Sequence, residues 1–330
     1  MSLFCAEGKK LGIFVEFWAN LSAAPLSYAK IRHRLFEGRP LVVDADPAAC
    51  LRQRAEALGR TSSCGGAGPI VVHQDMSSLR EHHLAEIESR VDVLCALTSD
   101  TTPRALAELG MEHRAARLTG KAVDLALELA EHSSRPVAVA GVLGSETLSA
   151  TGRGRFEEEI QEHASRIAVA GAEMTIVQGM GSFKELYFAV SAAVSQRQST
   201  WAVLDDHLCE SDLQGTLHGL RAAGAEAIIF EVRSVDEGLK KLAQVAEMES
   251  QLVLGTFLSA APDALRGYPS SLFSSWVDRV VELIEAGARI VGGGAGTTEA
   301  HTRALVARLG TSHPSMVPPS LQTASSSDIS

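Results

Sequence analysis

The sequence predicts an α/β protein that folds as a closed (β/α)8 barrel, the TIM-barrel fold. Short β-rich runs alternate with amphipathic helical stretches, which is typical of parallel strands joined by helical crossovers. Eight evenly spaced runs can be counted, near residues 41–45, 91–97, 136–142, 173–178, 200–205, 226–232, 251–257 and 288–293. A doubly wound open sheet is the alternative, but that fold does not need eight evenly spaced strands. The length of 330 residues suits one barrel of about 250 residues with extensions.

The barrel is assigned to residues 39–310, which leaves an extension at each end. Residues 311–330 are rich in Ser, Thr and Pro and have little apolar surface to bury, which predicts a disordered tail. Inside the barrel, residues 70–73 are a candidate minor strand in the long first crossover.

The extension over residues 1–38 carries an aromatic cluster of Phe14, Phe17 and Trp18. Two interpretations stay open. The segment is either a helix packed on the barrel or a docking surface for another subunit, because aromatic clusters on extensions often mark interfaces. The second interpretation predicts a homo- or hetero-oligomer formed through residues 1–38.

Composition narrows the class of ligand and the compartment. With 30 basic and 40 acidic residues the net charge is -10, which argues against binding nucleic-acid phosphates and is compatible with cationic ligands. The five cysteines are odd in number and scattered, so they indicate neither a disulfide framework nor a zinc knuckle, and a reducing cytoplasm is expected. No apolar stretch approaches the roughly 20 residues of a membrane span.

A glycine-rich stretch over residues 291–298 follows an apolar run and precedes a helical pattern. It predicts a strand, a tight turn and a helix that Thr297 or Thr298 can cap. Glycines at 292, 293, 294 and 296 would let a backbone or a ligand approach closely. The turn is therefore either a small-ligand site or a simple tight connection, and it lacks the Gly-Lys-Ser/Thr ending of a P-loop.

The sequence of this stretch resembles the last strand of the homocysteine S-methyltransferase family. The resemblance lies in Gly292-Gly293, Gly296-Thr297-Thr298 and His301. That family has Gly-Gly-Cys-Cys-Gly-Thr-Thr here, and both cysteines bind zinc. Gly294 and Ala295 occupy their places, and Val232 falls on the third zinc-binding cysteine. The resemblance spans residues 41–309 and implies a (β/α)8 barrel that has lost all three thiolate ligands.

In such a barrel the active site lies at the carboxyl ends of the strands. Asp44 falls on an aspartate of the family, and Asp46 is either a second carboxylate of the site or the cap of the next helix. The resemblance places Ser99 or Asp100 where relatives have a substrate-binding asparagine. It also places Gln178 on a glutamate that contacts homocysteine, so hydrogen-bonding capacity is kept while charge is lost.

The fifth strand ends in Asp205, Asp206 and His207, the densest ionisable cluster of the chain. Two carboxylates beside an imidazole support general acid/base chemistry or bind a divalent ion, although the same residues are also ordinary in a turn. Neighbouring residues of a strand point in opposite directions, so at most one of the aspartates need face the barrel mouth. The remaining binding candidates are Glu146, Met180, Thr256, Phe257, Gly293, Gly294 and Thr297.

The strand ends together predict an acidic mouth, which suits a sulfonium or an amine. We expect a zinc-independent enzyme that binds S-adenosylmethionine or a similar sulfonium. It would catalyse methyl transfer, or a related displacement, on a small amine or amino-acid-derived substrate, as in specialised metabolism. Glu231, Asp205 or His207 would act as the base. No zinc is expected, because Val232, Gly294 and Ala295 offer no ligand atom.

Two alternatives remain. The chain is a catalytically silent barrel that stabilises another enzyme as a partner subunit, or it is a thiol methyltransferase that has recruited Asp205, His207 or Glu231 as new zinc ligands.

Overall fold

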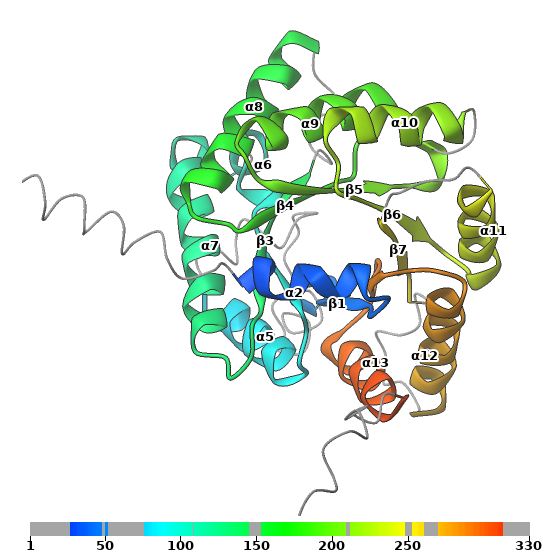
Figure 1. The fold of residues 1–330 in the computed structure, drawn as a ribbon. Helices are drawn as coiled ribbons and strands as arrows, with labels where there is room; N and C mark the ends of the chain where they lie inside the picture. The colour runs from blue at the N-terminus through cyan, green and yellow to red at the C-terminus, as the bar shows by residue number, and fades with distance from the viewer. Residues whose placement is uncertain are drawn as a thin grey trace, which may run out of the picture.

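Eight parallel strands close into a barrel in the order β1 to β8, as the sequence predicts (Figure 1). The computed structural model describes residues 27–47, 50–51, 76–107, 109–144, 153–208, 212–247, 253–260 and 270–312. The strands are β1 (Leu41–Val43), β2 (Val93–Ala96), β3 (Ala138–Gly144), β4 (Met174–Gln178), β5 (Ser199–Leu204), β6 (Ala227–Val232), β7 (Val253–Leu258) and β8 (Ile290–Gly293). β8 pairs with β1, Leu41 opposite Ile290, and this pairing closes the barrel.

Helices surround the strands as an outer ring (Figure 1). They are α5 (Met76–Glu88), α6 (Pro103–Ala107), α7 (Ala115–Glu131), α8 (Arg153–Val169), α9 (Phe183–Ser195), α10 (Leu213–Ala223), α11 (Val235–Ala246), α12 (Ser270–Glu285) and α13 (Glu299–Ser312). A further helix, α2 (Ser27–Phe36), lies across one end of the barrel (Figure 1). Short 3-10 turns span Ser99–Thr101, Glu112–Arg114 and Asp206–Leu208. None of these helices is long and apolar enough to cross a membrane.

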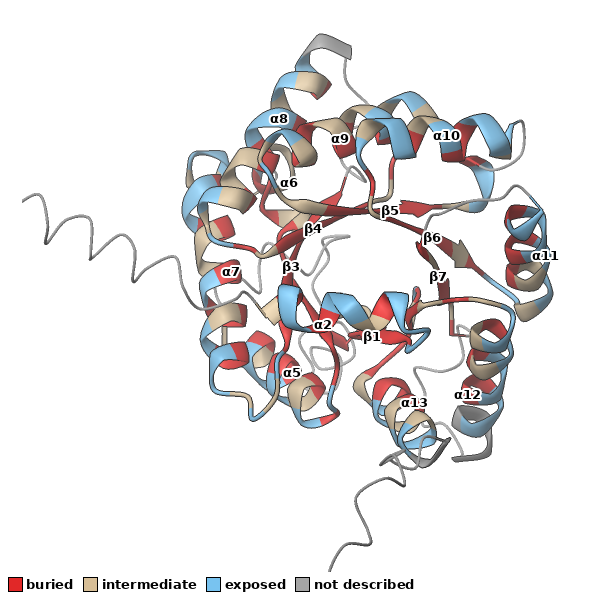
Figure 2. Cartoon of the chain, in the orientation of Figure 1, coloured by how far each residue is buried: buried red, intermediate tan, exposed pale blue. Residues whose placement is uncertain are grey.

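Side chains of the strands alternate between the barrel interior and the layer beneath the helices. The interior cluster includes Val43, Cys95, Ile176, Trp201, Ile229 and Phe257. The residues between them, such as Leu204, Phe230 and Val232, belong to the outer cluster that packs on the helices. Both clusters are buried, so the strands are almost entirely red in Figure 2 while the helices are exposed on their outer faces.

Helix α2 covers the amino-terminal end of the barrel (Figure 1). The Tyr28 hydroxyl accepts a hydrogen bond of 3.2 Å from Trp201 Nε1, inside the barrel. The Glu173 carboxylate, just before β4, accepts from the backbone amides of Ser27 and Tyr28 at the start of α2 and from Val139 of β3. The later part of the N-terminal extension therefore packs on the barrel.

Some sequence predictions fall outside the described residues. They are the aromatic cluster Phe14, Phe17 and Trp18, the candidate minor strand at residues 70–73 and residues 313–330.

Candidate active site

A cavity of about 330 Å³ opens at the carboxyl ends of the strands. Every strand contributes to its wall, either directly or through the residues that follow it. Its apolar surface includes Val43, Cys95, Val142, Ile176 and Phe257. This is the end at which enzymes of this fold carry their active sites.

The polar part of the wall is acidic. Five carboxylates line the cavity, and the residues that form its described wall include no Lys, Arg or His. They are Asp44, Asp46, Asp100, Asp205 and Glu231. Uncharged polar groups come from Ser99 and Gln178. A cavity of one charge sign, bounded by apolar walls, concentrates ions of the opposite sign.

Asp205 and Glu231 form a carboxyl pair inside this cavity. Leu204 pairs with Phe230 in the ladder between β5 and β6, so Asp205 and Glu231 follow at matching positions. Burial raises the pKa of Glu231 to about 7, and the hydrogen bond with Asp205 and its negative charge act in the same direction. Glu231 can therefore take up or release a proton near neutral pH.

The glycine-rich turn forms one side of the cavity, to which Gly293 and Gly294 contribute. A Cβ added at Gly294 would lie 2.8 Å from Ser259 N and 2.9 Å from Leu258 C, so this position has no room for a side chain. Thr297 is buried behind the turn, where its hydroxyl donates to Gly294 O at 2.9 Å and accepts from the backbone amide of Asp46 at 3.2 Å. Thr297 thus supports the turn from behind and does not line the cavity.

Three other predicted residues also lie off the cavity wall. Thr256 comes between Gly255 and Phe257 of β7, and strand alternation turns its side chain away from the interior. Met180 is buried in the outer cluster. His207 lies in the 3-10 turn after β5 with a half-exposed side chain, its Nδ1 3.9 Å from Asp205 Oδ2. Glu146 lies outside the described residues.

Asp206 does not line the cavity but accepts a hydrogen bond of 3.0 Å from Lys241 Nζ on α11. Of the two aspartates, only Asp205 lines the cavity, and Asp206 begins the 3-10 turn that follows β5.

Sequence reasoning missed a group of ionisable side chains behind Asp44, which we call the buried histidine cluster: Asp44, His82, His83, Glu86 and Glu299. The first four are at most 2% exposed. A signal was present, since His82, His83 and Glu86 follow Leu79 at the i+3, i+4 and i+7 spacing of a core-facing helix stripe, where apolar residues are the rule.

Burial shifts the pKa values in this cluster. It raises the pKa of Asp44 to about 6 and that of Glu86 to about 8, while the charge of His82 opposes both changes. Burial lowers the pKa of His82, but the hydrogen bond with Glu299 and the nearby carboxylates outweigh it, so the pKa is raised. Burial, with the charge of His82, holds the pKa of His83 well below its ordinary value.

The positions that the resemblance assigns to zinc do not fit a thiolate-bound ion. Val232 belongs to the outer cluster, and its side chain lies beneath α11 and not in the cavity. Gly294 and Ala295 line the cavity without a donor atom. No step of a mechanism can therefore be derived through zinc at these positions.

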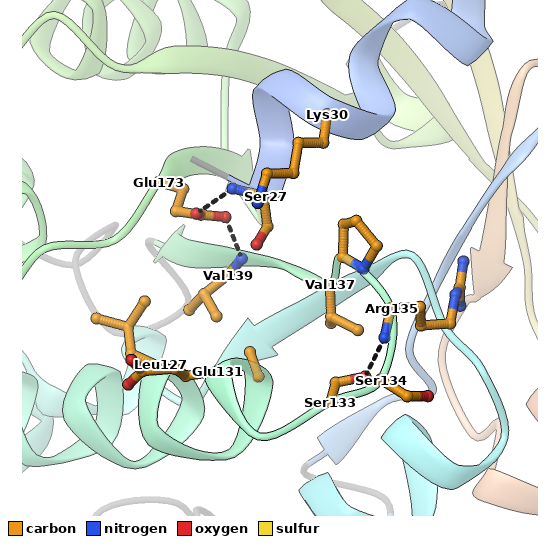
Figure 3. A pocket seen from close by; sticks show the side chains of 12 residues that line it. Ser27, Lys30, Leu127, Glu131, Ser133, Ser134, Arg135, Val137, Val139 and Glu173 are labelled. Atoms are coloured by element: carbon orange, nitrogen blue, oxygen red, sulfur yellow. Dashed lines mark hydrogen bonds between the residues drawn. The ribbon is translucent and has the colours of Figure 1, made fainter. Parts of the chain in front are cut away.

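The second large cavity lies at the opposite end of the barrel, between α2, α7 and β3 (Figure 3). Its volume is about 500 Å³. Two of its charged groups already serve the fold, because Glu173 holds the start of α2 and Arg135 donates to Val91 O at 2.7 Å. We therefore regard the acidic cavity as the candidate site.

A closed (β/α)8 barrel with a polar cavity at the carboxyl ends of its strands has the architecture of an enzyme. The family model of the homocysteine S-methyltransferases matches residues 41–309, and the chain belongs to this family. The sequence-based assignment of the family and its extent is thereby confirmed, and methyltransferase-like chemistry is the class to which the chain is assigned.

Solved structures agree on the fold. The metallated form of the homocysteine methyltransferase MmuM from Escherichia coli is 20% identical with a TM-score of 0.69, covering 84% of this chain and 99% of that one. Its oxidized form is 21% identical with a TM-score of 0.68 over the same shares of both chains. A search of curated protein sequences found no match.

Proposed function

We propose that this barrel binds a sulfonium methyl donor, such as S-adenosylmethionine, in its acidic cavity. The barrel transfers the methyl group to a small amine or amino-acid-derived acceptor, or catalyses a related displacement on such an acceptor. The reaction does not use a thiolate-bound zinc ion. Family membership supports methyl transfer. The observation that carries the choice of ligand is the cavity wall itself, with five carboxylates and no basic side chain among its described residues.

The charge of a sulfonium changes during the reaction in a way that suits this wall. The lone pair of the acceptor nitrogen attacks the methyl carbon, the carbon–sulfur bond breaks, and its electron pair stays on sulfur as a neutral thioether. The positive charge thus moves from sulfur to nitrogen. Carboxylates placed around the path stabilise the cation at each stage, because they need not reorganise as water would.

Glu231 is the group that we assign as the base. Its raised pKa, near 7, lets the carboxylate accept the proton that the methylated ammonium group loses, and Asp205 holds it by a hydrogen bond. His207 lies outside the wall, so it acts at most through Asp205. Asp46, after β1, provides further negative charge to the wall.

The uncharged wall supplies orientation. Gln178 and Ser99 offer hydrogen-bond donors and acceptors to the amino and carboxyl groups of a substrate, Phe257 offers an apolar face, and Gly293 and Gly294 let it approach the backbone. Together they would hold donor and acceptor in line, which is the main contribution a protein can make to such a displacement.

Titration calorimetry with S-adenosylmethionine and S-adenosylhomocysteine tests the proposal. The two differ by the methyl group and the charge on sulfur, so a cation-selective wall should bind the sulfonium about tenfold or more tightly. Glu231→Gln and Asp205→Asn should each remove most of that preference. Asp206→Asn is the matched control, because Asp206 is the same residue type one position along and lies off the wall.

Transfer of a labelled methyl group from S-adenosylmethionine to a set of amines and amino acids then measures activity, with homocysteine included as a slow acceptor. No saturable binding of either compound, or equal binding of both in all variants, would contradict the proposal.

A further inference from the structure

The buried histidine cluster lies where three elements meet. Asp44 follows β1, His82, His83 and Glu86 come from α5, and Glu299 begins α13. Asp44 also lines the acidic cavity, so the cluster lies directly behind its wall. It is separate from Val232, Gly294 and Ala295, the positions of the family's cysteines.

Three of these side chains are arranged as metal ligands. Asp44, His82 and His83 can each offer one ligand atom, and the three atoms lie within 4.8 Å of one another. Ligands bound to one tetrahedral ion lie about 3.4 Å apart, given bonds of about 2.0–2.1 Å. Small side-chain rotations would therefore bring the three atoms onto a single ion.

Several polar atoms in the cluster lack hydrogen-bond partners among the described residues. They are both ring nitrogens of His83, Nε2 of His82, Oδ1 of Asp44 and Oε2 of Glu86. Each buried polar atom that is left unpaired destabilises the folded protein. Without a metal ion, a protonated His82 could form ion pairs with the surrounding carboxylates. Both ring nitrogens of His83 would still lack hydrogen-bond partners. A bound cation satisfies ligand atoms from all three side chains at once.

The surroundings of His82 match those of a metal-bound histidine. Its Nδ1 lies 3.1 Å from Glu299 Oε1, which orients the ring and leaves Nε2 as the nitrogen without a partner. Histidine ligands of metals typically donate their second ring N–H to a carboxylate in this way. Asp44 Oδ2 is likewise held by the backbone amide of Cys95 at 3.0 Å, which leaves Oδ1 as the unpaired oxygen.

We propose that one divalent transition-metal ion of the zinc class is bound by Asp44, His82 and His83, with Glu299 orienting His82. Two imidazoles and one carboxylate favour zinc, cobalt or iron over magnesium and calcium, which prefer oxygen ligands. The ion joins the end of β1 to α5 and, through Glu299, to α13. It stabilises the carboxyl end of the barrel, and it does not depend on the proposed methyl transfer.

Metal titration of the full chain tests this site. After the protein is stripped with a chelator, Co2+ is titrated while visible absorption is followed, and Zn2+ then displaces it. We expect one equivalent of either ion, little response to Mg2+, and a rise of the melting temperature by several degrees with Zn2+. His83→Ala should abolish stoichiometric binding, and Glu299→Gln should weaken it by about 10- to 100-fold.

His163→Asn provides the matched control. His163 is also fully buried and has an unpartnered ring nitrogen. It belongs neither to the group Asp44, His82 and His83 nor to a second possible metal-binding group among the described residues, Cys50, His82 and Glu299. Its replacement should leave metal affinity unchanged. Binding that is clearly substoichiometric, or equally weakened by His163→Asn and His83→Ala, would overturn the proposal.

X-ray absorption at the zinc edge of the unmutated protein gives a result that does not depend on how the variants fold. The expected spectrum has nitrogen and oxygen neighbours at about 2.0–2.1 Å and imidazole scattering. A shell containing sulfur, or one without imidazole, would place the ion elsewhere and overturn the assignment.

Discussion

Glu231 is the residue on which the proposed chemistry depends most. Its carboxyl group combines a strand position that faces the cavity with a neighbour, Asp205, of the same charge. Two such carboxyl groups in contact cannot both ionise easily, and one of them keeps its proton to higher pH. The pair therefore changes charge in the range where most enzymes work.

The affinity for S-adenosylmethionine should therefore depend on pH. The raised pKa of Glu231, about 7, means that the carboxyl group is neutral below that pH and charged above it. Affinity should rise roughly five- to tenfold between pH 6 and pH 8, since one more negative charge then faces the cation. Calorimetric titrations across this range measure it, with Glu231→Gln as the reference in which most of the rise is lost and only the smaller contribution of Asp44, whose pKa is raised to about 6, remains. An equal rise in that variant would assign the titration to another group.

Gly294 is a second residue that matters at this scale. It has no side chain to bind zinc, and the surrounding backbone leaves no room for the side chain of a cysteine. An added Cβ would meet the backbone of residues 257–259 at 2.8–3.0 Å, and backbone cannot rotate out of the way. A cysteine placed there would need β7 to move.

Gly294→Ala should accordingly destabilise the protein by about 1–3 kcal/mol through overpacking. Gly120→Ala in α7 is the control, because its Cβ would meet nothing within 4 Å and alanine favours a helix by up to about 1 kcal/mol. Urea unfolding curves compare the two. If both variants were equally stable, the turn at Gly294 would accommodate a methyl group, and the prediction would be wrong.

Among the elements, α2 holds the amino-terminal end of the barrel. It covers the amino-terminal end of the barrel and buries Tyr28, Ile31 and Leu35 against it. The carboxylate of Glu173 accepts from two backbone amides in the first turn of α2, where amides have no partner inside the helix, and the positive end of the helix dipole also favours it.

Glu173→Ala should cost about 1–2 kcal/mol of stability and increase hydrogen exchange in α2. Glu162→Ala on α8 removes a glutamate of the same charge whose side chain is 63% exposed and pairs with Arg166 four residues along. That control should cost no more than about 0.5 kcal/mol. Equal losses, or unchanged exchange in α2, would show that Glu173 does not hold the helix.

Helix α5 shows where reasoning from the sequence was incomplete. The expectation that no zinc is bound considered the positions of the family's cysteines and the fifth and sixth strands. It did not consider His82 and His83, because a helix in a barrel usually packs with apolar side chains. Their partners Asp44 and Glu299 are about 40 and more than 200 residues away along the chain.

At the scale of the whole molecule, the barrel follows from local patterns. Parallel strands covered by helices on one side and by the barrel interior on the other read as short apolar runs, and all eight appear within a few residues of their predicted places. Once the strands close, all their carboxyl ends meet at one edge. This is why acidic residues from four separate segments come to line one cavity.

The sequence by itself determined the family, the order of the strands and the set of polar residues at their ends, because these depend on residue type and local period. Only the tertiary structure decided which of those residues face the cavity. Strand alternation and register turn Asp205 and Glu231 inward and Thr256 and Val232 outward, while loop geometry leaves Met180 and His207 off the wall. The tertiary structure also decided that Asp44 lies beside His82 and His83, because contacts between distant segments exist only after the barrel has closed.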